Sequence, residues 1–105
     1  IVIPSSVTYI GDSAFDYCIS LTSVVIPNGV TAIGDCAFSC CQSLTSIVIP
    51  RSVSYIGSYV FYGCSSLTIY CEAESQPITW YDGWNSNDYH YGDDALCPVV
   101  WGYKG

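Results

Sequence analysis

The sequence predicts an α/β solenoid in which three 23-residue repeats coil one upon another and are closed by a C-terminal cap. The first observation behind this prediction is internal similarity: when residues 1–23, 24–46 and 47–69 are aligned, eleven of the 23 columns hold the same residue in all three copies. The second is composition, since 50% of the residues are hydrophobic and only 10% are charged. Such a chain can bury a shared core and does not resemble a disordered segment.

A short strand is predicted where one repeat passes into the next. In the second copy the segment 21–26 is rich in β-branched residues and ends at Pro27, which has no amide to donate to a sheet. Alternation directs Leu21, Val24 and Ile26 inward and leaves the residues between them on the outer face. Equivalent strands of successive repeats are therefore expected to form a parallel sheet.

The remainder of each repeat is predicted to turn back towards the next strand. Gly34 supplies conformational freedom for a bend, and residues 35–41 predict one helical turn with Asp35 as its N-cap. One repeat cannot bury its own apolar side chains, so we expect like residues of successive coils to stack in ladders. The clearest ladder is the phenylalanine column, which contains Phe15, Phe38 and Phe61.

The chain divides near residue 71 into two chemically different parts. Residues 1–70 hold the three repeats and carry few charges, whereas residues 71–105 are rich in acidic and aromatic side chains and are interpreted as the cap. The open end of the repeat core is expected to be covered by three tryptophans, Trp80, Trp84 and Trp101.

The repeat motif, L-x-x-V-x-I-P-x-x-V-x-x-I-G-x-x-A-F-x-x-C, resembles the BspA-like, or treponemal-type, leucine-rich repeat over residues 1–70. Residues 71–77, 84–85 and 97–102 resemble the cap of such proteins, with a longer insertion at 86–96. The resemblance implies a right-handed leucine-rich-repeat coil with a short parallel β-sheet on the concave side and short helical or irregular segments on the convex side. It also implies a non-catalytic adhesion module of an extracellular or cell-surface protein, chiefly bacterial, that binds host matrix or cell-surface proteins.

The seven cysteines fall into groups with different expected roles. Cys18, Cys41 and Cys64 share one column, where buried, reduced thiols acting as small hydrophobic side chains are expected. Cys71 replaces an inward isoleucine at the end of the last strand, and Cys97 precedes an apolar segment. A Cys71–Cys97 disulfide would close a span of 26 residues and would imply an oxidising, extracellular compartment.

No metal site, cofactor or catalytic centre is predicted. Cys36, Cys40 and Cys41 form a C-x-x-x-C-C run, but structural zinc needs four ligands, and the sole histidine, His90, lies 49 residues beyond Cys41. His90 is also remote from every cysteine except Cys97, so a Cys–His hydrolase is not indicated. The acidic residues of the cap do not follow the spacing of a calcium-binding loop.

Charge and hydropathy exclude two classes of partner. Arg51 and Lys104 are the only basic side chains and the net charge is −7, so the chain cannot replace the counterions of a nucleic acid. No apolar run is long enough to insert into a membrane. A protein is therefore the expected partner.

Two candidate binding surfaces remain. The first is the outer face of the predicted strands, whose polar and β-branched side chains are Thr22, Ser23, Val25, Thr45, Ser46, Val48, Thr68 and Tyr70. Within this face, Val2, Val25, Val48 and Tyr70 form an apolar row. Two interpretations of the row stay open: it marks an interaction surface, or it reflects only the preference of such residues for β-strands. The second surface consists of Tyr89 and Tyr91 in the insertion, which could stack on a sugar or a protein.

Three functions are consistent with these surfaces. The first is a protein-binding or adhesion module, the second is a purely structural terminal segment of a longer solenoid, and the third is carbohydrate binding through the cap aromatics. Because the first coil has no cap of its own, further repeats upstream or end-to-end self-association are also expected.

Overall fold

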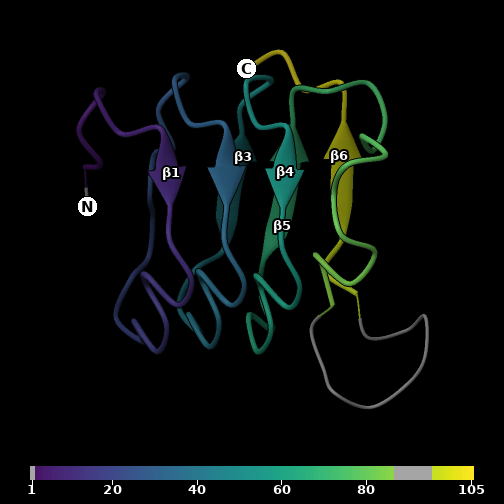
Figure 1. The fold of residues 1–105 in the computed structure, drawn as a ribbon. Helices are drawn as coiled ribbons and strands as arrows, with labels where there is room; N and C mark the ends of the chain where they lie inside the picture. Colours follow the sequence, from purple (N-terminus) through teal and green to yellow (C-terminus); the bar gives the residue numbers. More distant parts are fainter. Residues whose placement is uncertain (1, 87–95) are drawn as a thin grey trace.

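The computed structural model describes residues 2–86 and 96–105, so Tyr89 and Tyr91 lie outside the described residues. The chain winds into successive coils that lie side by side, with strands of equivalent position next to one another (Figure 1). Within these two ranges, six short strands form two separate three-stranded parallel sheets.

The sheet predicted from the sequence contains β3 (Ser46–Ile49) and β5 (Thr68–Cys71), and β6 (Val99–Trp101), which was not predicted, pairs with β5 to complete the order β3-β5-β6. We call it the outer-row sheet, because its outer face carries a row of apolar side chains. In the first two repeats the same position is marked by a parallel bridge between Val2 and Val25. The expected alternation is confirmed, since Ile47 and Ile49 are buried while Val48, which lies between them, is partly exposed.

A second sheet, which the sequence analysis did not predict, contains β1 (Tyr9–Ile10), β2 (Ala32–Ile33) and β4 (Tyr55–Ile56). Its strands are two residues long and pair in the register of the repeat, so that Ile10 lies opposite Ile33 and Ile33 opposite Ile56. The isoleucines face the core and are buried. Two residues are too few to show the alternation by which a strand is recognised in a sequence.

The segments that connect the two sheets are turns, and the predicted helical turn over residues 35–41 is wrong. No helix occurs within the two described ranges. Cys36 and Cys40 have φ angles of 57° and 58°, in the left-handed region that a right-handed helix excludes. Alternate amides of these turns instead bond to the next coil, as in Phe15 N–H to Ala37 O at 2.7 Å and Phe38 N–H to Val60 O at 2.9 Å.

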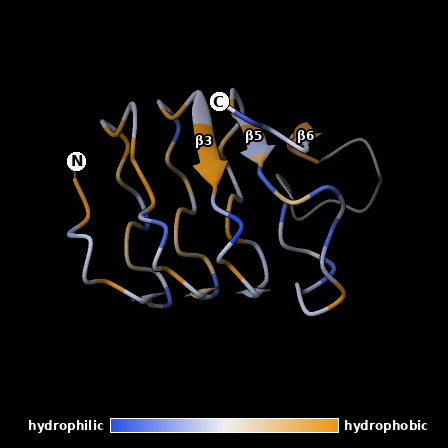
Figure 2. Ribbon diagram, turned by 90° about the horizontal axis from the view of Figure 1, so that it is seen from above, coloured by the Kyte–Doolittle hydropathy of each residue, from blue (hydrophilic) through white to orange (hydrophobic). Residues whose placement is uncertain are grey.

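The core is a set of side-chain ladders that run along the stack of coils. The rings of Phe15 and Phe38 are stacked with centroids 5.2 Å apart, and those of Phe38 and Phe61 with centroids 5.8 Å apart. The predicted register of the phenylalanines is therefore confirmed. Figure 2 shows the same regularity in the backbone, because hydrophobic segments recur at the same place in successive coils.

The aspartate column joins neighbouring coils instead of capping its own. Asp12 Oδ1 accepts a hydrogen bond from the amide of Asp35 at 2.9 Å, and Asp35 Oδ1 accepts one from the amide of Ser58 at the same distance. A Cβ atom added at Gly34 would overlap the Asp12 carboxylate, and one added at Gly57 would overlap that of Asp35. Glycine is required at both positions because the carboxylate of the preceding coil occupies the space.

This packing predicts that Gly34→Ala and Gly57→Ala each lower the free energy of unfolding by about 1–3 kcal/mol, the usual cost of an overpacked site. The Cβ would also lie within 2.9 Å of the backbone nitrogen of the aspartate, which cannot move away freely. Urea denaturation measures the loss. Gly29→Ala is the matched control, since its Cβ would meet only ordinary contacts at 3.6 Å or more. Equal stabilities for all three variants would contradict the proposed role of the glycines.

Candidate functional site

Apolar side chains occupy the outer face of the outer-row sheet and the equivalent position of the first two repeats. Val48 lies opposite Tyr70, and Tyr70 lies opposite Val100, while Val2 and Val25 bridge at the other end. We call these five residues the outer row. Val2, Val25 and Val100 are 87%, 70% and 42% exposed.

Four members of this row are predicted from the sequence, and Val100 is not. Val100 lies in the apolar segment 99–101, but the insertion before this segment obscures its alignment with the repeats. Only the pairing of β6 with β5 shows that Val100 belongs to the row. The signal available in the sequence was the valine doublet, which matches the Val24–Val25 doublet of the second repeat.

The polar candidates border the outer row. Thr22, Ser23, Thr45 and Ser46 are exposed, and Thr68 is half-buried in β5. Hydroxyl groups on an extended face can supply hydrogen bonds around an apolar centre, which is the usual arrangement of a protein interface.

The C-terminal end of the outer row is supported by the tail of the chain. The ring of Tyr70 packs against that of Tyr103, with centroids 5.0 Å apart. The amide of Tyr103 donates to Cys71 O at 2.9 Å, which attaches the tail to β5. Tyr70 is therefore half-buried and held in place, unlike the exposed valines.

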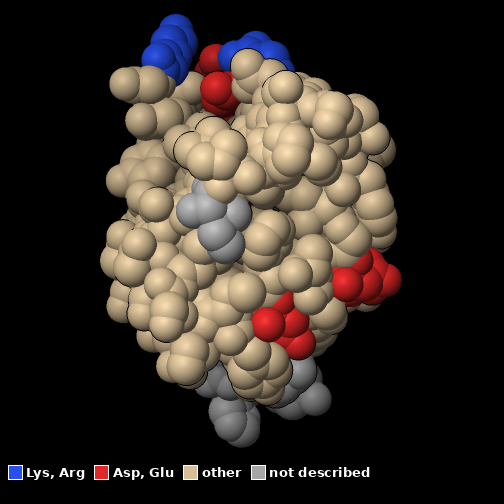
Figure 3. All heavy atoms as spheres, turned by 90° about the vertical axis from the view of Figure 1, so that its left-hand side faces the viewer, with Lys and Arg blue, Asp and Glu red and all other residues tan. Residues whose placement is uncertain are grey.

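Charged groups lie away from the outer row. No Asp, Glu, Lys or Arg occurs in residues 21–26, 44–49, 67–71 or 99–101. At the edge of the stack, Arg51 makes two hydrogen bonds to Glu72. Its guanidinium Nη2 donates to the Glu72 carbonyl oxygen at 3.2 Å, and its backbone amide donates to Glu72 Oε1 at 2.8 Å. Figure 3, a view from the N-terminal end, shows basic and acidic side chains together at the top, further acidic side chains in the lower part, and uncharged side chains between them.

The tryptophans of the cap close the C-terminal end of the core, as predicted. Trp80 and Trp84 are 3% and 1% exposed, with ring centroids 4.9 Å apart. Trp101 packs on both, and Trp84 also meets the last core phenylalanine, Phe61, edge-on at 6.3 Å. The indole nitrogens of the two buried tryptophans are satisfied, because Trp80 Nε1 donates to Val53 O and Trp84 Nε1 donates to the Gln76 side chain.

Comparison with known families assigns the repeats. A family model described as the BspA type leucine rich repeat region, with six copies, matches residues 1–78. The chain belongs to this BspA type family. No curated protein and no solved structure matches the chain.

Members of the BspA type family are generally protein-binding or adhesion modules without catalytic activity, and are typically bacterial surface or secreted proteins. Within the described part of this chain, no helix has the length and apolar character needed to cross a membrane. In residues 2–86 and 96–105, no three His, Cys, Asp or Glu side chains are grouped so that they could hold a metal ion.

The cysteine column of this BspA type chain extends further than its sequence suggests. Cys41 Sγ donates to Phe15 O at 3.2 Å, and Cys64 Sγ donates to Phe38 O at 3.1 Å. Cys97 Sγ continues the series towards Phe61 O at 3.9 Å. The thiols are reduced, as expected, but they are hydrogen-bond donors between coils as well as small apolar groups.

The expected Cys71–Cys97 disulfide is not formed in this structure, where both cysteines are free. The strand register gives the reason. Cys71 lies opposite Trp101, so Cys97 lies four residues back along the strand direction, roughly 13 Å away at 3.3 Å per residue. A disulfide requires Cα atoms within about 7 Å of each other.

Burial raises the pKa of the Cys36, Cys71 and Cys97 thiols. It raises the pKa of Cys71 to about 12 and that of Cys97 to about 11. The pKa of Cys36 is also raised, by burial first and then by the nearby carboxylates of Asp16, Asp35 and Asp12. Cys64 differs, because its interaction with the Cys41 side chain lowers its pKa, but its side chain is completely buried.

The raised pKa of Cys71 predicts a loss of stability at high pH. The pKa rises from 9.0 to about 12 on folding, so the folded state holds this proton more tightly than the unfolded state. The stabilisation is complete below about pH 9 and is lost as the pH rises towards about 12. Cys71→Val removes the titrating group and keeps an apolar side chain, so its unfolding free energy should fall less steeply between about pH 9 and 11. Urea denaturation across this range measures both slopes; identical slopes would contradict the buried thiol.

Proposed function

We propose that this chain is a non-catalytic protein-binding module of a secreted or cell-surface protein, and that the outer row is its contact surface. The observation that carries the proposal is an outward apolar side chain at the same position of successive coils: Val48, Tyr70 and Val100 are neighbours in the outer-row sheet, and Val2 bridges Val25 in the first two repeats. Contiguous exposed apolar surface is uncommon on soluble proteins and typically marks an interaction site.

The composition of this face indicates the chemistry of the partner. An apolar centre bordered by threonine and serine hydroxyls, without charged side chains, suits a partner surface of similar character. Affinity would come from removing apolar area from water rather than from ion pairs, so binding should depend only weakly on salt. Host matrix or cell-surface proteins are the expected partners, in keeping with the family.

A charge placed in the outer row tests this proposal. Val25→Lys should weaken binding to immobilised laminin, collagen or fibronectin by at least tenfold, because the lysine ammonium would have to lose its water on contact. Surface plasmon resonance measures the affinity of the purified chain for each of these matrix proteins.

Tyr9→Lys is the matched control, since Tyr9 is 55% exposed on the opposite sheet and the change in charge is the same. It should bind as the unaltered chain does. An equal loss of affinity in the two variants would mean that the added positive charge, and not its position, weakens binding. Full binding by Val25→Lys would exclude the outer row as the contact surface.

A purely structural role is the second candidate, and the tryptophan cap favours it. Trp80, Trp84 and Trp101 seal one end of the core, as a terminal segment of a longer stack requires. In that case binding by the full-length protein should be unchanged by Val25→Lys. Carbohydrate binding through Tyr89 and Tyr91 remains a prediction for residues outside the described part of the chain.

A further inference from the structure

We propose that Asn28 is a site of spontaneous chemical modification, where the backbone amide of Gly29 attacks the asparagine side chain and converts it to aspartate and isoaspartate. Asn28 and Gly29 form the single Asn-Gly pair of the sequence. They lie in the turn that leads from the outer-row position of the second repeat to β2, and both residues are exposed. The turn is closed by a hydrogen bond from Val30 N–H to Pro27 O at 3.1 Å.

This turn leaves both reacting groups free to meet. The Gly29 nitrogen must lose its proton and approach the Asn28 Cγ atom. Neither the Gly29 N–H nor the Asn28 side chain has a hydrogen-bond partner among the described residues. Glycine also presents no Cβ to hinder the approach, and the space around it is open, since a Cβ there would meet nothing closer than Ser5 O at 3.6 Å.

The reaction balances with water as the only other reactant. A bond forms between Gly29 N and Asn28 Cγ, and the bond from Cγ to Nδ2 breaks. The Nδ2 group leaves as ammonia with the proton from the Gly29 amide, and the product is a cyclic imide. Water then opens the imide ring: breaking the Cγ–N bond gives aspartate, and breaking the bond from N to the Asn28 main-chain carbonyl carbon gives isoaspartate.

Asn85, the other asparagine among the described residues, shows the opposite arrangement. Its Nδ2 donates to Cys97 O at 3.3 Å. The amide that follows it, of Ser86, donates to Gly83 O at 3.2 Å. Attack at Asn85 would require both hydrogen bonds to break first, so the structure directs the modification to Asn28.

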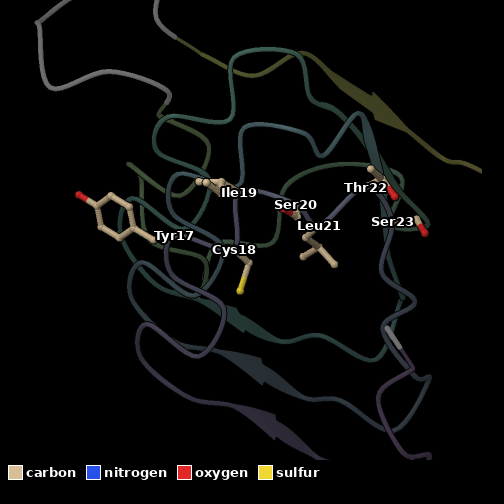
Figure 4. Close-up of a pocket in the computed structure, with 7 residues that line it drawn as sticks. All are labelled: Tyr17, Cys18, Ile19, Ser20, Leu21, Thr22 and Ser23. Atoms are coloured by element: carbon tan, nitrogen blue, oxygen red, sulfur yellow. The ribbon is translucent and has the colours of Figure 1, made fainter.

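Side-chain nucleophiles gather in a different part of the molecule. The thiol of Cys18 and the hydroxyls of Ser20, Thr22 and Ser23 line a hollow of about 510 Å³ (Figure 4). No asparagine or glutamine is among residues 17–23, which line this hollow. These thiol and hydroxyl groups therefore have no side-chain amide to attack within the hollow.

The modification would place a new carboxylate beside Arg51. Asn28 and Arg51 share one column of the repeat. Their turns lie against each other, since Ser52 Oγ donates to Val30 O at 2.7 Å. The product adds a negative charge to a chain whose net charge is already −7, and isoaspartate also lengthens the main chain within a turn of the repeat.

Incubation of the purified chain in mildly alkaline buffer, followed by peptide mass spectrometry, tests the proposal. The peptide that contains Asn28 should gain the mass difference between an amide and an acid and should separate into two products. One product should co-elute with the same peptide from an Asn28→Asp variant, and isoaspartyl methyltransferase should label the other. An unchanged peptide, under conditions that convert a short unstructured Asn-Gly peptide, would overturn the proposal.

Two further variants test whether the free groups of this turn select Asn28. Gly29→Ala should slow the conversion by at least about tenfold, because the Cβ hinders the approach of the nitrogen. Ser86→Gly creates a second Asn-Gly pair in which both reacting groups form hydrogen bonds, so its conversion should be at least about tenfold slower than that of Asn28. Equal rates at the two pairs, or an unchanged rate in Gly29→Ala, would contradict the proposed selection.

Discussion

Contacts between residues 23 positions apart are the interaction on which the rest of this structure depends. Within the described residues no coil contains a helix, and no strand pairs within its own coil. Backbone groups instead bond to the coil before or after, in both sheets and along the turns. The stacked rings of Phe15, Phe38 and Phe61 add apolar contact along the same direction. A single coil would leave all of these groups without partners.

This arrangement separates stability from recognition. The side chains that face inward form the ladders of the core. The side chains of the outer row and its polar border face away from the core and take no part in these ladders. Substitutions on the outer face can therefore vary the partner while the coil is retained. Tyr70 is an exception, since its contact with Tyr103 also holds the C-terminal tail.

The sequence predicted those features that recur as residue identity in a column: the Phe ladder, the inward isoleucines and the tryptophan cover. Other features depended on backbone geometry. The left-handed φ of Cys36 was hidden, because its column contains Ser13 and Tyr59, residues that give no signal for that region. The register of β6 follows an insertion that interrupts the period, and this led to the disulfide that Cys97 does not form. Gly34 is predicted from the sequence to give conformational freedom for a bend, whereas in the structure its missing side chain leaves space for the carboxylate of the preceding coil.

The most direct test of this dependence on neighbouring coils is the unfolding of Phe38→Ala, which removes the middle ring of the ladder. Because Phe38 is completely buried and contacts both other rings, the free energy of unfolding should fall by about 3–5 kcal/mol. Hydrogen exchange should show that amides of all three coils lose protection together. A loss below about 1 kcal/mol, or a variant in which the first and third coils keep their protection independently, would contradict the account.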